Sequence, residues 1–546
     1  MRKVKYSIHG LCACAALSIA AAFASGDAGA APLPIVAKHS GKCLDITGGP
    51  GATAPGVAAE QWECTGATNQ SFTLQSDGAG RFQIIPQHSG LCLGAANGNE
   101  NAPVFQTTCN VTDIKQLWAK QTAGASTEFT FKQVSGGRCL AVAGGTGATG
   151  NGPAIQLQAC PTPAANQIWT IGRNPLYWPF TQSSIWNTPI GSGAQYVAAG
   201  LPAIPDDPND HFPNNGPPID SGWSPMPQID EERIVLVPTA PQVTIQYSSG
   251  GWSGNRCTTS TLPNPNFTGL PVANVPIPAS YLLDDPDPKN DGAAFLMSDG
   301  ETLVQTEPWA RCTSGGPATS IIRILDDGTN NNTNSGSDGN IKTGNGRKGA
   351  HGGSMLGTLG GTIRLGEMRP GSGQGPHHAL KINLFSKMEL FNCSVVADCF
   401  RWPAYTADSG ATTNYGSINN NTNSAMKMGA LLAIPPSVNI NNIGLLSEPG
   451  RQIAWTLQNY GAYVVDSMGA GMGISAESGY HGSKLDEFAA DYPGLSMKAR
   501  VGHGENSDWS HDLQIIRPLL QVVNNNSATS VGGGGTPRQP LAPPLQ

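Results

Sequence analysis

Charged residues are scarce in this chain of 546 residues. They make up 13% of the sequence, about half of the ~25% that is usual in globular domains. Because the net charge is −7 and no basic stripe occurs, we expect no nucleic-acid partner. With 69 glycines and 43 prolines, helix breakers are too frequent for bundles or coiled coils. The apolar content of 39% argues against general disorder, so the composition predicts a turn-rich β-protein.

Long apolar runs are absent beyond the N-terminus. There, three basic residues within the first five positions precede an apolar stretch at 11–23, and small residues follow at 28–30. This pattern is typical of a secretory signal peptide over residues 1–30. Its apolar part is shorter than the ~20 residues that cross a bilayer. We therefore expect a secreted, extracellular protein, or a periplasmic one in transit, without a membrane span.

No Cys-x-x-Cys pair occurs among the ten cysteines that follow the signal segment, which excludes a zinc ribbon or a thioredoxin-like site. An even number of cysteines in an exported chain predicts disulfide bonds. Cys393 and Cys399 lie six positions apart and are expected to pair. Cys257 and Cys312 would then form another bridge, although other pairings stay open.

A threefold internal repeat fills the first third of the chain. Each copy begins with Gly-x-Cys-Leu, holds a second cysteine further on, and ends in Gln-x-Phe or Gln-x-Trp. Each copy is therefore predicted to join its own two cysteines, which gives the pairs Cys43–Cys64, Cys92–Cys109 and Cys139–Cys160. A bridge that closes a loop of about 20 residues contributes roughly 3 kcal/mol.

The repeated Gln-x-Trp, together with the paired cysteines, resembles the signature of ricin B-type lectin domains over residues 33–173. The resemblance implies a β-trefoil with three lobes, each a potential sugar site. One short repeat cannot bury its own apolar face, whereas three copies around a pseudo-threefold axis can. We expect Phe72, Trp118 and Trp169 to fill the shared core.

A competent lobe of that family has an Asp after its first Cys, an aromatic residue before its second Cys, and an Asn before the Gln. The first repeat matches with Asp45, Trp62, Asn69 and Gln70. An aromatic face covers the C–H side of a pyranose, and carboxylate and amide groups bond its hydroxyls. The resemblance therefore implies a carbohydrate site here; the alternative is that Asp45 only caps a turn. The other two repeats lack the Asp and the aromatic residue and are expected to be scaffold.

Residues 180–523 form a larger β-rich module in this interpretation. Short apolar runs punctuated by Gly, Asn and Pro predict stacked antiparallel sheets, as in a β-sandwich or jelly roll. The predicted strands lie at 233–237, 242–247, 294–297, 302–305, 320–325, 362–365 and 379–384. One helix is predicted from the cap Ser447 to Tyr460, and a second near Asp512 is expected to be disturbed by Pro518. Residues 524–546 are predicted to be a tail or a strap along the surface.

No Gly-x-Ser-x-Gly elbow, Walker loop or His-Glu-x-x-His motif occurs, so no motif fixes a reaction. A lectin-like module raises the local concentration of its attached domain near a polymer. The leading hypothesis is therefore a glycoside hydrolase that acts on a polysaccharide. Such an enzyme needs two carboxyl groups beside the scissile bond, and Glu307 and Glu367, each at the end of a predicted strand, are the candidates.

Two alternatives stay open. A polysaccharide lyase would use a His or Tyr base, with His378 or His351 as the candidate. A lectin or adhesin without catalysis would bind with both modules. No cofactor is expected to be required, and the protein is expected to be a monomer. The run 285–292 is similar to a calcium loop but lacks the later Glu of an EF-hand, so a structural Ca²⁺ there is a minor expectation.

Overall fold

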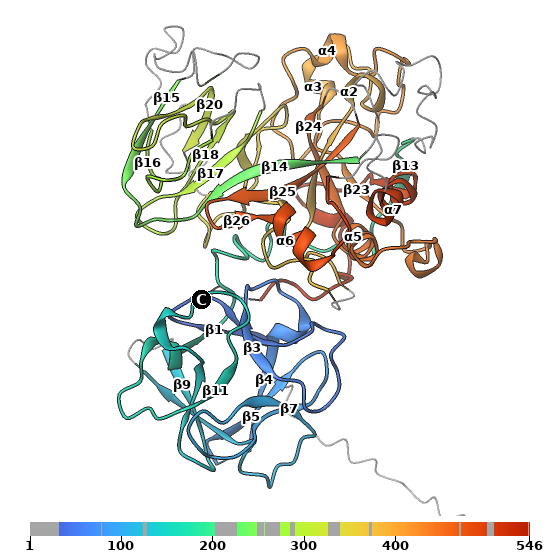
Figure 1. Cartoon of the computed structure of the whole chain (residues 1–546). Coiled ribbons are helices and arrows are strands. Elements are labelled where there is room, and N and C mark those ends of the chain that lie inside the picture. The colour runs from blue at the N-terminus through green and yellow to red at the C-terminus, as the bar shows by residue number, and fades with distance from the viewer. Residues whose placement is uncertain are drawn as a thin grey trace, which may run out of the picture.

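Two domains lie one above the other in the computed structural model (Figure 1). The structure describes residues 32–77, 79–123, 128–201, 227–247, 256, 273–283, 290–325, 339–370, 374–468, 471–498, 507–543 and 545. The predicted signal peptide, Cys257 and residues 285–289 of the calcium-like run lie outside these residues. The chain is mainly β, as the composition predicted.

The N-terminal domain is a β-trefoil. Its first and last strands pair with each other, so the chain closes on itself. Phe72, Trp118 and Trp169 are buried in one shared core, which confirms their predicted place. The indole N–H groups of Trp118 and Trp169 donate to the carbonyls of Leu93 and Leu140, each at 3.0 Å. The strands are β1 (Leu33–Ala37), β2 (Cys43–Ile46), β3 (Ala59–Trp62), β4 (Ser71–Ser76), β5 (Arg81–Pro86), β6 (Cys92–Ala95), β7 (Val104–Thr107), β8 (Trp118–Thr122), β9 (Glu128–Gln133), β10 (Cys139–Val142), β11 (Ile155–Gln158) and β12 (Trp169–Ile171).

Disulfide bonds join the cysteines of each repeat, as predicted: Cys43–Cys64, Cys92–Cys109 and Cys139–Cys160. In the larger domain the predicted Cys393–Cys399 bridge is also present. Cys312 is disulfide-bonded, but its predicted partner falls outside the described residues.

A mixed sheet forms the centre of the larger domain, in the order β13-β27-β23-β24-β22-β25-β14-β17-β18-β20. The expectation of purely antiparallel sheets is wrong, because β14 runs parallel to both β17 and β25, and β22 runs parallel to β24. The segments between these parallel strands are long enough to cross over the sheet. The bounds are β13 (Tyr196–Ala198), β14 (Pro227–Val235), β17 (Ala293–Leu296), β18 (Leu303–Glu307), β20 (Ile322–Leu325), β22 (Leu380–Leu384), β23 (Leu431–Ala433), β24 (Ala462–Ser467), β25 (Met472–Gly479) and β27 (Gln521–Val523).

A three-stranded sheet, in the order β16-β15-β19, packs against the end of the mixed sheet. Side chains from both sheets, among them Val243, Phe295 and Trp309, form one buried cluster. This part of the domain is a small sandwich, in line with the sequence prediction. Its strands are β15 (Gln242–Tyr247), β16 (Ala273–Pro276) and β19 (Ala318–Ser320). Two shorter strands complete the domain, β21 (Lys348–His351) and β26 (Gly482–Ser483). The predicted strand at 362–365 is only an isolated bridge at Ile363.

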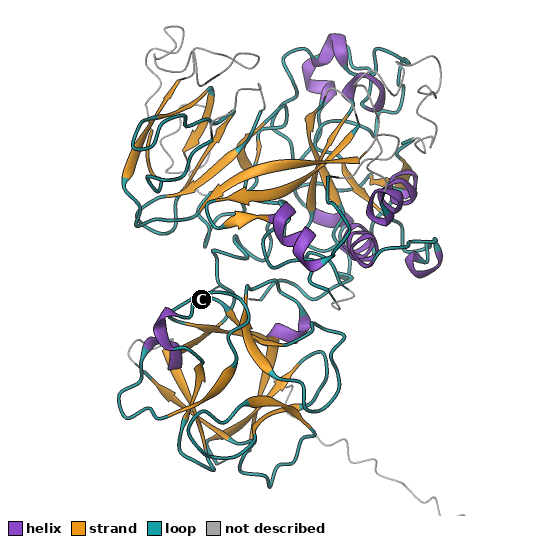
Figure 2. Ribbon diagram, in the orientation of Figure 1, coloured by secondary structure: helices purple, strands orange, loops and turns teal. Residues whose placement is uncertain are grey.

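Helices α5, α6 and α7 cover one side of the mixed sheet (Figure 2). Helix α5 (Glu448–Asn459) begins after Ser447, whose hydroxyl accepts a hydrogen bond from the Gly450 N–H. Helix α7 (Asp508–Ile516) passes into a 3₁₀ turn that contains Pro518, as predicted. Helix α6 (Lys484–Asp491) was not predicted. Three single-turn helices also occur: α2 (Ser386–Glu389), α3 (Val396–Cys399) and α4 (Ala411–Asn414).

The last described residues return to the junction between the two domains. Arg173, which follows the trefoil, donates through Nε to the carbonyl of Pro543 at 2.5 Å. Gly191 pairs with Pro537, and the Arg538 N–H donates to the Ile190 carbonyl at 2.9 Å. The C-terminal segment is therefore a strap along the surface.

Candidate functional site

Polar side chains line one face of the mixed sheet where β14 and β22 lie on either side of β25. Alternate residues of a strand share a face. The pairs Asp230 and Glu232 on β14, and Lys381 and Asn383 on β22, follow this spacing. Asn383 donates to Asp230 at 2.8 Å, and the Lys381 ammonium lies 2.7 Å from Glu232. The sheet therefore presents a buried row of hydrogen-bonded charges rather than an apolar face.

His351, at the end of β21, is attached to this row. Its Nε2 lies 2.8 Å from the Glu232 carboxylate. Burial opposes the charge of Glu232, but Lys381 and His351 outweigh it and lower the pKa of Glu232 to about 2. Burial lowers the pKa of His351. Because Nε2 faces the Glu232 carboxylate, Nδ1 is the ring nitrogen left for another partner.

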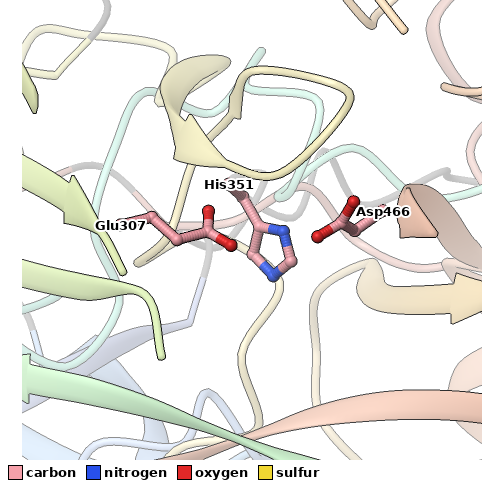
Figure 3. Close-up of side chains that lie close together, drawn as sticks. All are labelled: Glu307, His351 and Asp466. Carbon is pink, nitrogen blue, oxygen red and sulfur yellow. The ribbon is translucent and has the colours of Figure 1, made fainter. Parts of the chain in front are cut away.

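Glu307 and Asp466 lie on either side of His351 (Figure 3). One ligand atom from each of the three residues lies within 4.8 Å of the other two. Glu307 ends β18 and accepts the Gly352 N–H at 2.5 Å, while Asp466 on β24 accepts the Gly353 N–H at 3.0 Å. Three strands and one glycine-rich turn thus bring two carboxylates and one imidazole together.

Burial and mutual repulsion raise the pKa of both carboxyl groups of this cluster. Burial, reinforced by the charge of Asp466, raises the pKa of Glu307 well above its usual range. Burial and the charge of Asp408 raise the pKa of Asp466 to about 8. Because like charges close together cannot all ionise, the cluster either keeps protons at neutral pH or needs a cation.

A pocket of about 690 Å³ opens onto this cluster. Asp408, Tyr415 and Asp466 line it, together with Gly352 and Gly353. The Tyr415 hydroxyl donates to the Asp408 carboxylate, and burial raises the pKa of Asp408. Pockets of this volume are large enough to hold small-molecule ligands, so the described residues place several acids beside a space of substrate size.

Of the catalytic candidates named from the sequence, Glu307 and His351 belong to this cluster, but Glu367 and His378 do not. The His378 Nε2 lies 3.2 Å from Glu367, and its Nδ1 lies 2.9 Å from the Ala379 carbonyl. Glu367 also accepts the Arg364 N–H at 2.7 Å and faces the trefoil rather than the pocket. The expected pairing of Glu307 with Glu367 across one bond is therefore not formed.

Sequence reasoning missed Asp230, Glu232, Asp408 and Asp466. The first two stand two positions apart just before the predicted strand 233–237, and this spacing of acids next to a β-rich run was the available signal. Asp466 directly follows the apolar run Tyr463 to Val465. Asp408 lies in a loop with no sequence signal of its own.

The first trefoil lobe holds its predicted residues together. Asp45 is fully buried and accepts hydrogen bonds from Asn69 at 3.0 Å and Gln70 at 2.8 Å. Cys43 stands opposite Trp62 and Asp45 opposite Glu60 in the β2–β3 ladder. The polar residues are therefore ordered around one carboxylate, as sugar recognition requires.

Arg369 of the larger domain occupies this lobe. Its guanidinium lies 4.1 Å from the centroid of the Trp62 ring, donates to Asp45 at 2.6 Å, and also pairs with Glu60. A cation on the aromatic face is attracted by the ring quadrupole. The space left beside Asp45 and Arg369 is about 20 Å³, far below the ~300–1,000 Å³ of pockets that hold small-molecule ligands. The lobe has no room for a sugar ring in this arrangement.

The family comparison agrees with the trefoil. Residues 31–169 match the model of the ricin-type beta-trefoil lectin domain, and no family model matches the rest of the chain. This part of the chain is therefore a ricin B-type lectin domain, a carbohydrate-binding module. Comparison with curated proteins gives no match.

Several solved structures are similar to about a quarter of this chain. A designed threefold-symmetric protein, ThreeFoil, is 25% identical over 26% of this chain and 97% of that chain, with a TM-score of 0.24. A ricin B-like lectin from Macrolepiota procera in complex with lactose is 18% identical over 26% and 94%, with a TM-score of 0.23. An exo-beta-1,3-galactanase from Clostridium thermocellum is 23% identical over 26% of this chain and 30% of that chain, with a TM-score of 0.24.

Within the described residues, no helix is both long and apolar enough to cross a membrane. The four disulfide bonds between described cysteines are consistent with an oxidising, extracellular environment.

Proposed function

We propose that this protein is a secreted, glycan-directed glycoside hydrolase. The trefoil binds the polysaccharide, and the pocket of the larger domain cleaves it. The observation that carries the proposal is the acid-lined pocket of about 690 Å³ in the domain attached to a lectin module. Glycosidic hydrolysis requires a carboxylic acid that still holds its proton at working pH and a second carboxyl group that assists the incoming water.

Asp408 is the proposed proton donor. Its carboxyl lines the pocket, burial raises its pKa, and the Tyr415 hydroxyl fixes its orientation. Asp466, which lies against Gly352 on the same pocket wall, is the proposed second carboxyl. This assignment replaces Glu367, whose carboxylate is committed to His378 and the Arg364 N–H.

The first lobe is the proposed glycan-binding lobe, where a glycan competes with the Arg369 side chain for the same contacts. The contacts that Arg369 makes with Trp62 and Asp45 are those expected of a pyranose and its hydroxyls. A glycan would therefore have to displace this side chain, and the observed arrangement is the low-affinity form of the lobe.

The experiment is to incubate the full chain with a panel of polysaccharides and follow three signals. New reducing ends support hydrolysis. A rise in ultraviolet absorbance from an unsaturated uronate would indicate a lyase instead. Retention on a glycan with neither product would reject catalysis and leave a lectin or adhesin.

A further inference from the structure

Glu307 and Asp466 lie on either side of the His351 ring (Figure 3), and Asp466 also lines the pocket. We propose that these three residues bind a divalent transition-metal ion of the Zn²⁺ class. Their ligand atoms lie within 4.8 Å of one another. Because Zn–N and Zn–O bonds measure about 2.0–2.2 Å, two ligands of one ion lie at most about 4.4 Å apart. Small side-chain rotations close the difference.

The imidazole of His351 is oriented for this role. Its Nε2 is held 2.8 Å from Glu232, which is itself paired with Lys381 at 2.7 Å. The other nitrogen, Nδ1, is buried and has no hydrogen-bond partner among the described residues. A buried nitrogen lone pair without a partner is costly, and a metal ion supplies that partner. A carboxylate behind a histidine is also the usual support of a ligating imidazole.

The two carboxylates are oriented in the same manner. Glu307 uses Oε2 to accept the Gly352 N–H, and Asp466 uses Oδ1 to accept the N–H groups of Gly353 and Ser467. These contacts engage one oxygen of each carboxylate and leave the second oxygen of each for a ligand. The backbone approaches closely here, because a Cβ on Gly352 would lie 1.9 Å from Asp466 Cγ.

Local charge favours a cation at the same place. Glu307 is close enough to Asp230 and Glu232 for their charges to repel, and Asp466 is likewise repelled by Asp230 and Asp408. On this face of the mixed sheet, the positive charge beside these five carboxyl groups is the Lys381 ammonium. It already pairs with Glu232 and donates to the Thr358 carbonyl at 2.5 Å. A buried excess of carboxylates is unfavourable unless it is paired, and a divalent ion offsets part of it.

The donor set indicates which metal. Ca²⁺ and Mg²⁺ prefer oxygen ligands alone, whereas one imidazole with two carboxylates suits Zn²⁺ or Mn²⁺. Three protein ligands leave a coordination position open, as in catalytic zinc sites. Asp466, Gly352 and Gly353 line the pocket, so a metal bound to Asp466 would lie next to the pocket. A metal bound there would supply an activated water. This catalytic role rests on the proposed hydrolysis, whereas the proposal of metal binding is independent of it.

Isothermal titration of the chelator-treated full chain with Zn²⁺, Mn²⁺ and Ca²⁺ tests the site. We expect one Zn²⁺ per chain, weaker Mn²⁺ and no comparable Ca²⁺ binding. Glu307→Gln, His351→Gln and Asp466→Asn should each weaken Zn²⁺ binding by at least about 100-fold, more than the 10–100-fold typical of outer-shell changes. Glu367→Gln and His378→Gln are matched controls, because they alter an equally buried Glu–His pair elsewhere, and should leave binding unchanged.

Visible absorption of the Co²⁺-substituted wild-type chain gives a readout that needs no variant to fold. Bands from a low-coordinate Co²⁺ centre that disappear on addition of one equivalent of Zn²⁺ support the site. Absence of stoichiometric binding by the wild-type chain overturns it, as does full binding in folded Glu307→Gln, His351→Gln and Asp466→Asn. Zn²⁺ binding by a chain that cleaves no glycan would remove the proposed hydrolase and leave the metal site standing.

Discussion

Arg369 stacks on Trp62 at 4.1 Å and donates to Asp45 at 2.6 Å, so a residue of the larger domain fills the best-formed lobe of the lectin domain. Its backbone carbonyl accepts a hydrogen bond from Gln452 of α5 at 2.8 Å. The position of this arginine is therefore set by the fold of the larger domain. Glycan binding by this lobe depends on whether that contact opens.

Removal of the Arg369 side chain is expected to open the first lobe. Arg369→Ala should raise affinity for the preferred immobilised glycan by about tenfold, since a glycan no longer displaces a charged pair worth about 1.4 kcal/mol or more. Adding Trp62→Ala to this variant should abolish the gain. Arg81→Ala, at an exposed trefoil arginine, is the control. Equal glycan retention by the wild-type chain, Arg369→Ala and the double variant would contradict the assignment of the lobe.

The trefoil core is expected to tolerate Phe but not Ala at position 118. Trp118→Ala removes a fully buried ring and should lower the free energy of unfolding by about 3–5 kcal/mol. Trp118→Phe should cost less, because Phe72 holds the corresponding position in the first repeat, although the bond to the Leu93 carbonyl is lost. Chemical denaturation measures both. An equal cost for the two variants would argue against interchangeable positions in the repeats.

Asp230 predicts a pH dependence of stability. Burial, with the charges of Glu232 and Asp291, raises its pKa to about 7, above the ~3.9 of an unfolded chain. Between these two pH values the folded state therefore binds more protons than the unfolded chain. The contribution of protonated Asp230 to the free energy of unfolding is complete below pH ~4 and is lost as the pH rises through 7. The wild-type chain should lose free energy of unfolding between pH 4 and pH 8. In Asp230→Asn this loss should be smaller by on the order of 2–4 kcal/mol, because the amide does not titrate.

Urea denaturation at the two pH values, without added metal, measures this difference. Asp398→Asn, at an exposed position, should follow the wild-type chain. A wild-type pH dependence that survives unchanged in Asp230→Asn would show that the carboxyl at 230 does not titrate in this window.

Gly352→Ala should disable the pocket without unfolding the domain. The added Cβ would lie 1.9 Å from Asp466 Cγ and would force that carboxylate away. We expect cleavage and Zn²⁺ binding to fall at least about tenfold together, in line with the cost of a misplaced ligand. Gly147→Ala, where a Cβ meets open space, is the control. Normal activity in a folded Gly352→Ala chain would contradict the placement of Asp466.

The trefoil could be predicted from the sequence because its signals are local and repeated. Cysteine pairs and Gln-x-aromatic recur three times, and each pair closes within one repeat. Helix α5 was also predictable, because the N-cap Ser447 is followed within one short segment by Ile453 and Leu457 at helical spacing. The mixed order of the large sheet was not, because strand direction depends on crossovers between β14, β25 and β22 that carry no repeated pattern.

The candidate site shows the same limit. Glu307 was identified from its place at a strand end, but its neighbours His351 and Asp466 come from two distant segments that only the fold brings together. Glu367 also follows a predicted strand, yet it pairs with His378 beside the trefoil. The local sequence does not show which of the two glutamates belongs to the site, because this depends on the buried residues that each side chain contacts in the fold.

The most direct test of the account is release of reducing ends from a polysaccharide panel by the wild-type chain and by Asp408→Asn, with Asp398→Asn as the surface control. We predict cleavage of at least one glycan by the wild-type and control chains, and a loss of at least about 100-fold in Asp408→Asn, the scale of a lost general acid. Undiminished cleavage by Asp408→Asn, or no cleavage of any glycan by a folded, metal-loaded wild-type chain, would contradict it.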